Sequence, residues 1–167
     1  AGSPAAPSGV GAPVSLVGPQ RLLVVPVRFP DVTPRRGLPQ ITGKVRRVVE
    51  WVRQASYGKA SIEPTMLDWQ PLPHPLATYR VSQYNFQVDR ARVRRLVEDT
   101  LAAASRGARV SDFPFVYIVV GAHTEPGTGY GMIAYAANPG MLTGVRRGRV
   151  DLDRLALPGG GTYAGGV

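Results

Sequence analysis

The sequence predicts an α/β fold, in which a mixed, twisted sheet is covered by two crossover helices. Segments rich in β-branched residues alternate with two amphipathic segments, in the order strand, helix, strand, helix, strand. Hydrophobic residues make up 44% of the 167 residues and charged residues 19%, which is typical of a folded chain. The longest apolar runs fall well short of the roughly 20 residues that cross a membrane, so no membrane partner is expected.

The first third of the chain predicts a leader, a strand, a helix and a second strand. Residues 1–20 are rich in Ala, Gly, Pro and Ser and are interpreted as a flexible linker or mature N-terminus. The strand at 21–29 contains Pro26, which we expect at a bulge or facing an unpaired side, because proline lacks a backbone donor. The helix at 40–55, with Thr42 as its expected cap, presents an apolar face at spacings of three and four residues: Ile41, Val45, Val48, Val49, Val52 and Ala55.

A second strand is predicted at 61–69, followed by a helix from Asp89, its cap, to about residue 105. The apolar stripe of this helix consists of Val93, Leu96, Val97, Leu101 and Ala104. The uninterrupted apolar run from Phe113 to Val120 favours a third strand that is covered on both faces. Residues 121–167 are rich in glycine and predict an irregular region.

The first helix ends in Ser56-Tyr57-Gly58-Lys59, where the chain must reverse into a strand. We expect Gly58 to supply a positive φ and the ring of Tyr57 to be buried against the turn. The need for a tight turn is a structural explanation for these residues, and we assign no catalytic role to them.

Two segments resemble the immune-inhibitor-A-like secreted zinc metallopeptidases. Val24-Val25-Pro26-Val27-Arg28-Phe29-Pro30-Asp31 is similar to the family's opening strand, and the segment from Trp51 to Ile62, with Ser-Tyr-Gly-Lys at its centre, is similar to its helix exit. The resemblance covers roughly residues 20–140. It implies that residues 21–167 are the N-terminal portion of a zincin catalytic domain, and that the protein is secreted and cleaves peptides.

The resemblance also implies a zinc ion held by a His-Glu-x-x-His helix, whose glutamate activates water. That motif is absent from this sequence, whose two histidines are His74 and His123. We therefore expect no catalytic and no metal-binding residue here. Zinc would belong to the parent enzyme, and the partner of this chain would be the missing C-terminal catalytic half or another covering chain.

Two other functions remain open from the residues alone. A non-catalytic binding or assembly module could retain the same scaffold. The net charge of +9, with 18 arginines among 20 basic residues, could instead indicate a nucleic-acid-binding domain. The arginines are spread along the chain without a dense run, which weighs against nucleic acid as a partner. The chain has no cysteine, which excludes disulfides and a thiol nucleophile.

Several polar residues of the chain admit both a structural and a functional interpretation. His74 lies between prolines and is expected in a loop, while His123, with Glu125 nearby, is either a loop residue or part of a metal site. Asp151 and Asp153 fit one face of a short strand or could contribute oxygens to a calcium site. The glycines of residues 127–131 predict a flexible loop rather than a phosphate-binding one, because they do not follow the first strand.

A peptide substrate would pair with an exposed edge strand, as extended peptides do on other sheets. The residues predicted for this edge are Gly131, Met132, Ile133 and Ala134, with the terminal segment 163–167 as an alternative.

Overall fold

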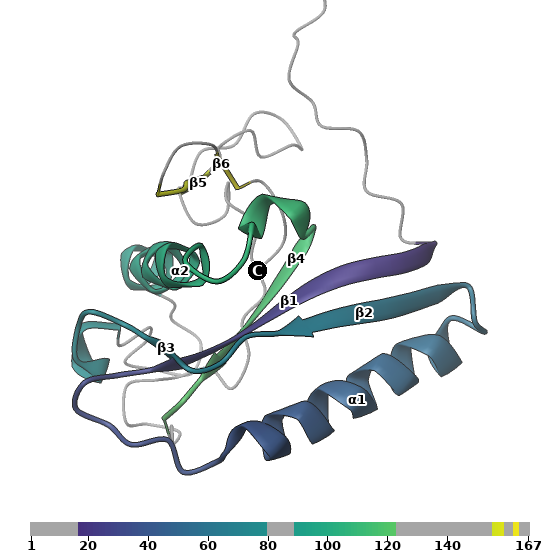
Figure 1. The fold of residues 1–167 in the computed structure, drawn as a ribbon, viewed down its shortest axis with the longest axis horizontal. Helices are drawn as coiled ribbons and strands as arrows, with labels where there is room; N and C mark the ends of the chain where they lie inside the picture. The colour runs from purple at the N-terminus through teal and green to yellow at the C-terminus, as the bar shows by residue number, and fades with distance from the viewer. Residues whose placement is uncertain (1–16, 80–88, 123–154, 159–161, 164–167) are drawn as a thin grey trace, which may run out of the picture.

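The computed structural model of the chain describes residues 17–79, 89–122, 155–158 and 162–163 (Figure 1). The main helices are α1 (Leu38–Ala55) and α2 (Arg90–Ala104), and two short 3-10 helices are η1 (Leu76–Tyr79) and η2 (Val110–Asp112). The strands are β1 (Gly18–Arg28), β2 (Ala60–Met66), β3 (Gln70–Pro71), β4 (Phe115–Val120), β5 (Leu155–Ala156) and β6 (Thr162–Tyr163).

Strand β1 is the centre of a four-stranded sheet. It pairs with β2 along its first half and with β3 at its end, and β4 pairs with it on the opposite side. All three pairings are parallel, and the separate β5–β6 pair is antiparallel. The α/β class and the three main strands are thereby confirmed.

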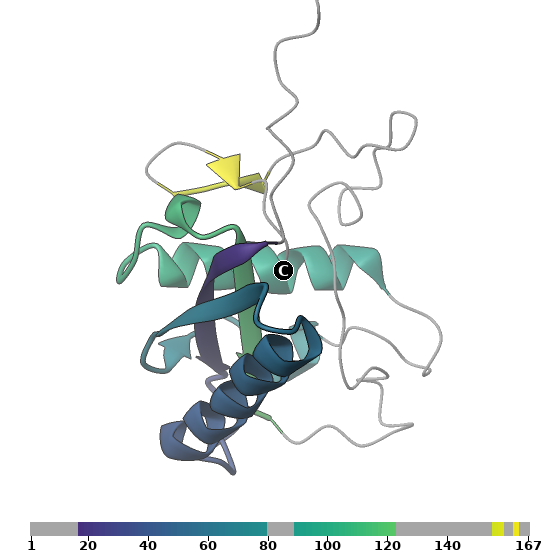
Figure 2. The same cartoon turned by 90° about the vertical axis from the view of Figure 1, so that its right-hand side faces the viewer.

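The two helices cover opposite faces of the sheet (Figures 1 and 2). Side chains alternate along a strand, so successive residues of β1 enter different layers. Leu23, Val25 and Val27 pack in the larger core with the stripe of α2, whereas Val24 packs with Ile41 and Val45 of α1. Five consecutive residues of β1 are buried because the strand is covered on both sides.

Pro26 lies at a position of β1 where its missing donor breaks no ladder bond. The Val24 carbonyl accepts from Leu67 at 3.0 Å and the Arg28 carbonyl accepts from Leu72 at 2.9 Å, so even-numbered residues of β1 face β2 and β3. Pro26 therefore faces the gap between these two strands. The expectation of an unpaired side is confirmed.

Helix α1 begins two residues earlier than predicted, and its cap is different. Gly37 is the N-cap, and its N–H donates to Oε1 of Gln40 at 3.0 Å. Thr42 lies inside the helix, where its hydroxyl donates to the Leu38 carbonyl at 3.0 Å, so the prediction of Thr42 as the cap is wrong. Pro39, in the first turn, has no intrahelical donor to lose, which allows the helix to start before it.

The apolar face of α1 is only partly buried. Ile41 and Val45 are buried, but Val48 is 46% exposed and Ala55 is exposed, contrary to the prediction. The cluster that packs α1 against the sheet includes Ile41, Val45 and Val49, but neither Val48 nor Ala55 belongs to it. For α2 the prediction is confirmed: the Asp89 carboxylate accepts from the N–H of Arg92 at 3.2 Å, and the predicted stripe faces the core.

Strand β4 is covered less completely than its sequence predicts. Val116 is buried beneath α2, but Tyr117 is 49% exposed and Val120 is 37% exposed. Tyr117 pairs in register with Val24, so its side chain lies on the same face of the sheet as α1. The helix nevertheless leaves this side chain partly exposed. The prediction of a strand buried on both faces is therefore wrong for this residue.

Candidate functional site

Ligands of parallel α/β sheets bind where neighbouring strands send the chain to opposite faces. Here β1 continues into α1 on one face, whereas β3 continues through η1 towards α2 on the other. The carboxyl ends of β1 and β3 are therefore the position at which the fold would place a site.

This position is filled by the protein's own side chains. Phe29, Leu72, Leu76 and Tyr79 are all buried there, and the rings of Phe29 and Tyr79 lie 5.5 Å apart between centroids. Such a tilted arrangement favours aromatic packing. The switch point is thus part of the core.

Asp31 joins the two loops that leave this position. Its Oδ1 accepts a hydrogen bond from the backbone N–H of Leu76 at 2.9 Å, at the start of η1. A carboxylate at the beginning of a helical turn satisfies a donor that has no partner within the turn. The Phe29-Pro30-Asp31 segment therefore has a structural function, which is to fix η1 against the end of β1.

The buried Tyr79 and the half-buried Asp99 form a polar pair at the edge of the core. The Tyr79 hydroxyl donates to Oδ2 of Asp99 at 2.6 Å. Burial, and then the hydrogen bond to Asp99, raise the pKa of Tyr79 well above its usual range. The buried hydroxyl therefore stays protonated and is not accessible to a substrate. His74 lies in an exposed loop, as predicted, with its ring centroid 6.0 Å from that of Tyr79.

Gly121 follows β4 at a point of close backbone approach. Its N–H donates to the Val27 carbonyl at 2.8 Å. A Cβ on this residue would lie 2.5 Å from that carbonyl oxygen and 2.7 Å from Cζ3 of Trp69. The end of β4 therefore requires glycine for steric reasons.

The helix exit is a two-residue left-handed turn. Tyr57 has a φ of 54° and Gly58 a φ of 76°. The Tyr57 N–H donates to the Gln54 carbonyl at 3.0 Å and the Gly58 N–H donates to the Arg53 carbonyl at 2.8 Å, which is the Schellman pattern. The positive φ of Gly58 is confirmed. The Tyr57 side chain is 92% exposed, so the prediction that its ring is buried is wrong.

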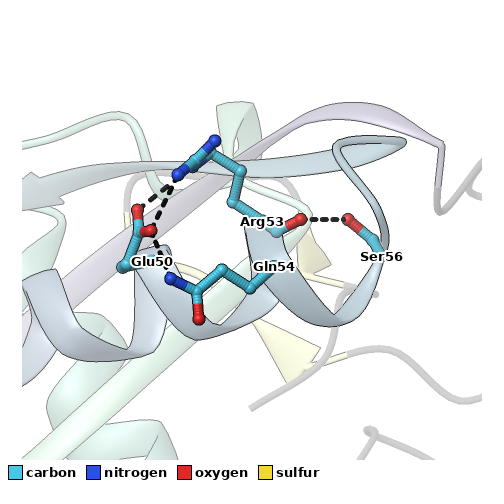
Figure 3. Close-up of polar contacts among 4 residues, drawn as sticks. All are labelled: Glu50, Arg53, Gln54 and Ser56. Atoms are coloured by element: carbon cyan, nitrogen blue, oxygen red, sulfur yellow. Dashed lines mark hydrogen bonds and ion pairs between the residues drawn. The ribbon is translucent and has the colours of Figure 1, made fainter.

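Side-chain contacts also fix this exit (Figure 3). The Ser56 hydroxyl accepts from the N–H of Ala60 at 3.0 Å and lies 3.2 Å from the Arg53 carbonyl, so it links the helix to the first residue of β2. Glu50 binds Arg53 at 2.7 Å and Gln54 at 2.6 Å. Hydrogen bonds from these two side chains lower the pKa of Glu50.

One flank of α1 combines exposed apolar and basic residues. Trp51 is 67% exposed and Val48 is 46% exposed, and both Lys44 and Arg47 are exposed beside them. We call these four residues the α1 flank. Their spacing of three, four and seven residues is visible in the sequence, but the predicted apolar face of the helix includes Val48 and does not include Trp51.

The residues predicted as functional sites fall mostly outside the described part of the chain. This holds for His123, Glu125, Asp151, Asp153 and the predicted edge residues Gly131, Met132, Ile133 and Ala134. Among the described residues, no group of three or more His, Asp or Glu side chains could hold a metal ion. None of the described helices is long and apolar enough to cross a membrane.

Four of the described arginines have partners within the protein. Three are held in exposed ion pairs within helices, Arg53 with Glu50, Arg92 with Asp89 and Arg94 with Glu98. Arg21 lies over the ring of Phe113, 4.8 Å from its centroid. Exposed pairs of this kind contribute little to stability.

No protein-family model, curated protein or solved structure matches this chain.

Proposed function

We propose that this chain is the N-terminal scaffold portion of a secreted zinc-dependent endopeptidase. The observation that carries the proposal is that both motifs of the resemblance fall at the carboxyl ends of β1 and α1 in a single β1–α1–β2 unit. Asp31 anchors one end of that unit through Leu76, and Ser56 anchors the other through Ala60. These contacts explain in structural terms why Asp31 and Ser56 occur in the two motifs.

The described residues do not themselves fit a zinc site, because no suitable set of three ligand side chains is present among them. Zinc would supply an activated water molecule in the parent enzyme, and we assign no catalytic step to this chain. Its own residues build a sheet centred on β1 and leave Tyr117 and Val120 of β4 partly exposed. The partial exposure of these two side chains supports the idea that a further segment covers β4, and we propose that this segment is the catalytic half.

The proposal is tested on the native protein. Antibodies against this chain would isolate it from its natural source, and its intact mass, zinc content and casein cleavage would be measured. We expect a mass above 17.9 kDa, one zinc ion per molecule and cleavage that chelation abolishes. A native species of 17.9 kDa with neither zinc nor cleavage would refute the proposal.

A non-catalytic binding module is the second candidate. The α1 flank favours it, because Trp51 and Arg47 belong to the residue types that dominate the energy of protein interfaces. The same isolation distinguishes the two, since a module would be recovered with a stoichiometric partner and without zinc.

A further inference from the structure

We propose that the α1 flank is a docking surface for an acidic, partly apolar segment of a separate partner protein. The flank consists of Lys44, Arg47, Val48 and Trp51. This inference goes beyond the proposed peptidase scaffold and does not depend on it, because the exposed side chains of the flank make no contribution to the buried cluster that holds α1 on the sheet.

The flank lies along one edge of the face by which α1 packs on the sheet. Ile41 and Val45 are buried against β1, and Val49 packs against the same cluster. Residues three and four apart on a helix are surface neighbours, so Arg47 and Val48 both adjoin Trp51. Trp51, 67% exposed, thus has an apolar neighbour and a cationic neighbour on one continuous stripe.

The charge of the flank is unbalanced. Lys44 and Arg47 form no ion pair with any described residue. Glu50 is the nearest acidic residue in the sequence of α1, but both of its carboxylate oxygens are engaged by Arg53 and Gln54. A carboxylate from another molecule would therefore find two free cations at this stripe.

These features favour an acidic protein segment over the other occupants. A second copy of the chain would bring a net charge of +9 against a basic stripe, which repels it. A membrane-binding helix needs a broad apolar face, and this stripe offers one tryptophan and one valine. An aromatic anchor flanked by cations matches a segment that combines large apolar residues with aspartate or glutamate.

The test is selection of peptides from a random 12-residue display library against the full chain, followed by titration of the most enriched peptide. We expect enrichment of peptides that combine acidic with large apolar residues. Trp51→Ala and Arg47→Glu should each weaken binding at least tenfold. All the exchanged side chains are exposed, and circular dichroism and thermal melting verify that each variant is folded.

Two matched variants control for charge and for aromatic content. Arg46→Glu makes the same charge change on the same helix but about 100° away around its axis. Tyr57→Asn removes an exposed ring outside the flank and tolerates the left-handed backbone. Both should change the affinity by no more than about twofold, since hot-spot energies are local.

Three outcomes would overturn the proposal. The first is a selection that yields no acidic peptides. The second is equal weakening by Arg46→Glu and Arg47→Glu, which indicates diffuse attraction of a basic protein. The third is binding of single-stranded DNA or phosphatidylserine vesicles that depends on Trp51 and Arg47 while the peptides fail to bind. None of these results bears on zinc or cleavage, so failure here is distinct from failure of the peptidase proposal.

Discussion

Tyr57 and Gly121 occupy backbone positions that constrain the side chain most strongly. Tyr57 has a left-handed φ of 54°, which disfavours side chains with a Cβ. Gly121 does not have a left-handed φ, but there is no room for a Cβ between the Val27 carbonyl and the ring of Trp69. The first residue is strained in its own conformation, and the second is fixed by its neighbours.

Replacing Tyr57 by glycine should stabilise the protein. The exposed ring contributes little packing, and glycine removes a left-handed penalty of about 1 kcal/mol. Urea unfolding should show the free energy of unfolding raised by up to that amount. Tyr57→Ala is the control, since it removes the ring and keeps the strain. Equal effects of the two changes would contradict this explanation.

Gly121→Ala should destabilise the protein by about 3 kcal/mol, in the range of overpacked cores. The Val27 carbonyl cannot retreat without losing its bond to the Gly121 N–H. Gly107→Ala is the matched control, because its Cβ would meet Leu67 at 3.9 Å, an ordinary contact. Thermal unfolding of both variants measures the difference, and similar melting temperatures would refute the steric argument.

At the scale of elements, the sequence predicts which helices and strands form, and in what order, better than it predicts how completely neighbouring elements cover them. The β-branched run at 21–29 and the stripe of α2 predict their elements because periodicity reflects burial. The cap of α1 was missed because Gly37 has no side chain that could accept a capping hydrogen bond, which is the feature that marks an N-cap in a sequence. The contact between Asp31 and Leu76 spans 45 residues and has no local pattern, so only the fold reveals it.

Loss of the Asp31 carboxylate should loosen η1. Asp31→Ala leaves the N–H of Leu76 without its acceptor and should lower the free energy of unfolding by about 1 kcal/mol. Asp31→Asn keeps an oxygen at the same position and should retain most of the stability. Hydrogen exchange at Leu76 would become faster in the alanine variant alone. Unchanged exchange in that variant would show that the contact is dispensable.

At the scale of the molecule, two buried tyrosines link stability to alkaline pH. Burial raises the pKa of both Tyr79 and Tyr163 above the usual value for tyrosine. The unfolded chain therefore ionises at lower pH than the folded one. Their contribution is fully present below about pH 10 and declines above it, by about 1.4 kcal/mol per pH unit for each residue.

Tyr79→Phe should remove one of these two contributions. The variant loses the hydrogen bond to Asp99 and is less stable at neutral pH. Its free energy of unfolding should then fall less steeply than that of the wild type between pH 10 and 11. Denaturant titrations at several pH values measure both slopes. If the free energy of unfolding fell equally steeply with pH in the variant and the wild type, Tyr79 would have the same pKa in the folded and unfolded states, which would contradict this prediction.

The α/β architecture could be predicted from the sequence because helix and strand periodicities alternate along it. A candidate site could not, because the switch point at the ends of β1 and β3 is filled by Phe29 and Tyr79 rather than open. The α1 flank was also missed, since helical periodicity locates the buried face and does not say how far the sheet extends beneath it.

The proposal that this chain supports catalysis without performing it is tested most directly by the zinc content of the purified 167-residue chain, together with its activity on casein. After dialysis against buffered zinc, we expect far less than one zinc ion per chain by mass spectrometry, and no cleavage. One tightly held zinc ion accompanied by hydrolysis that chelators abolish would contradict the account.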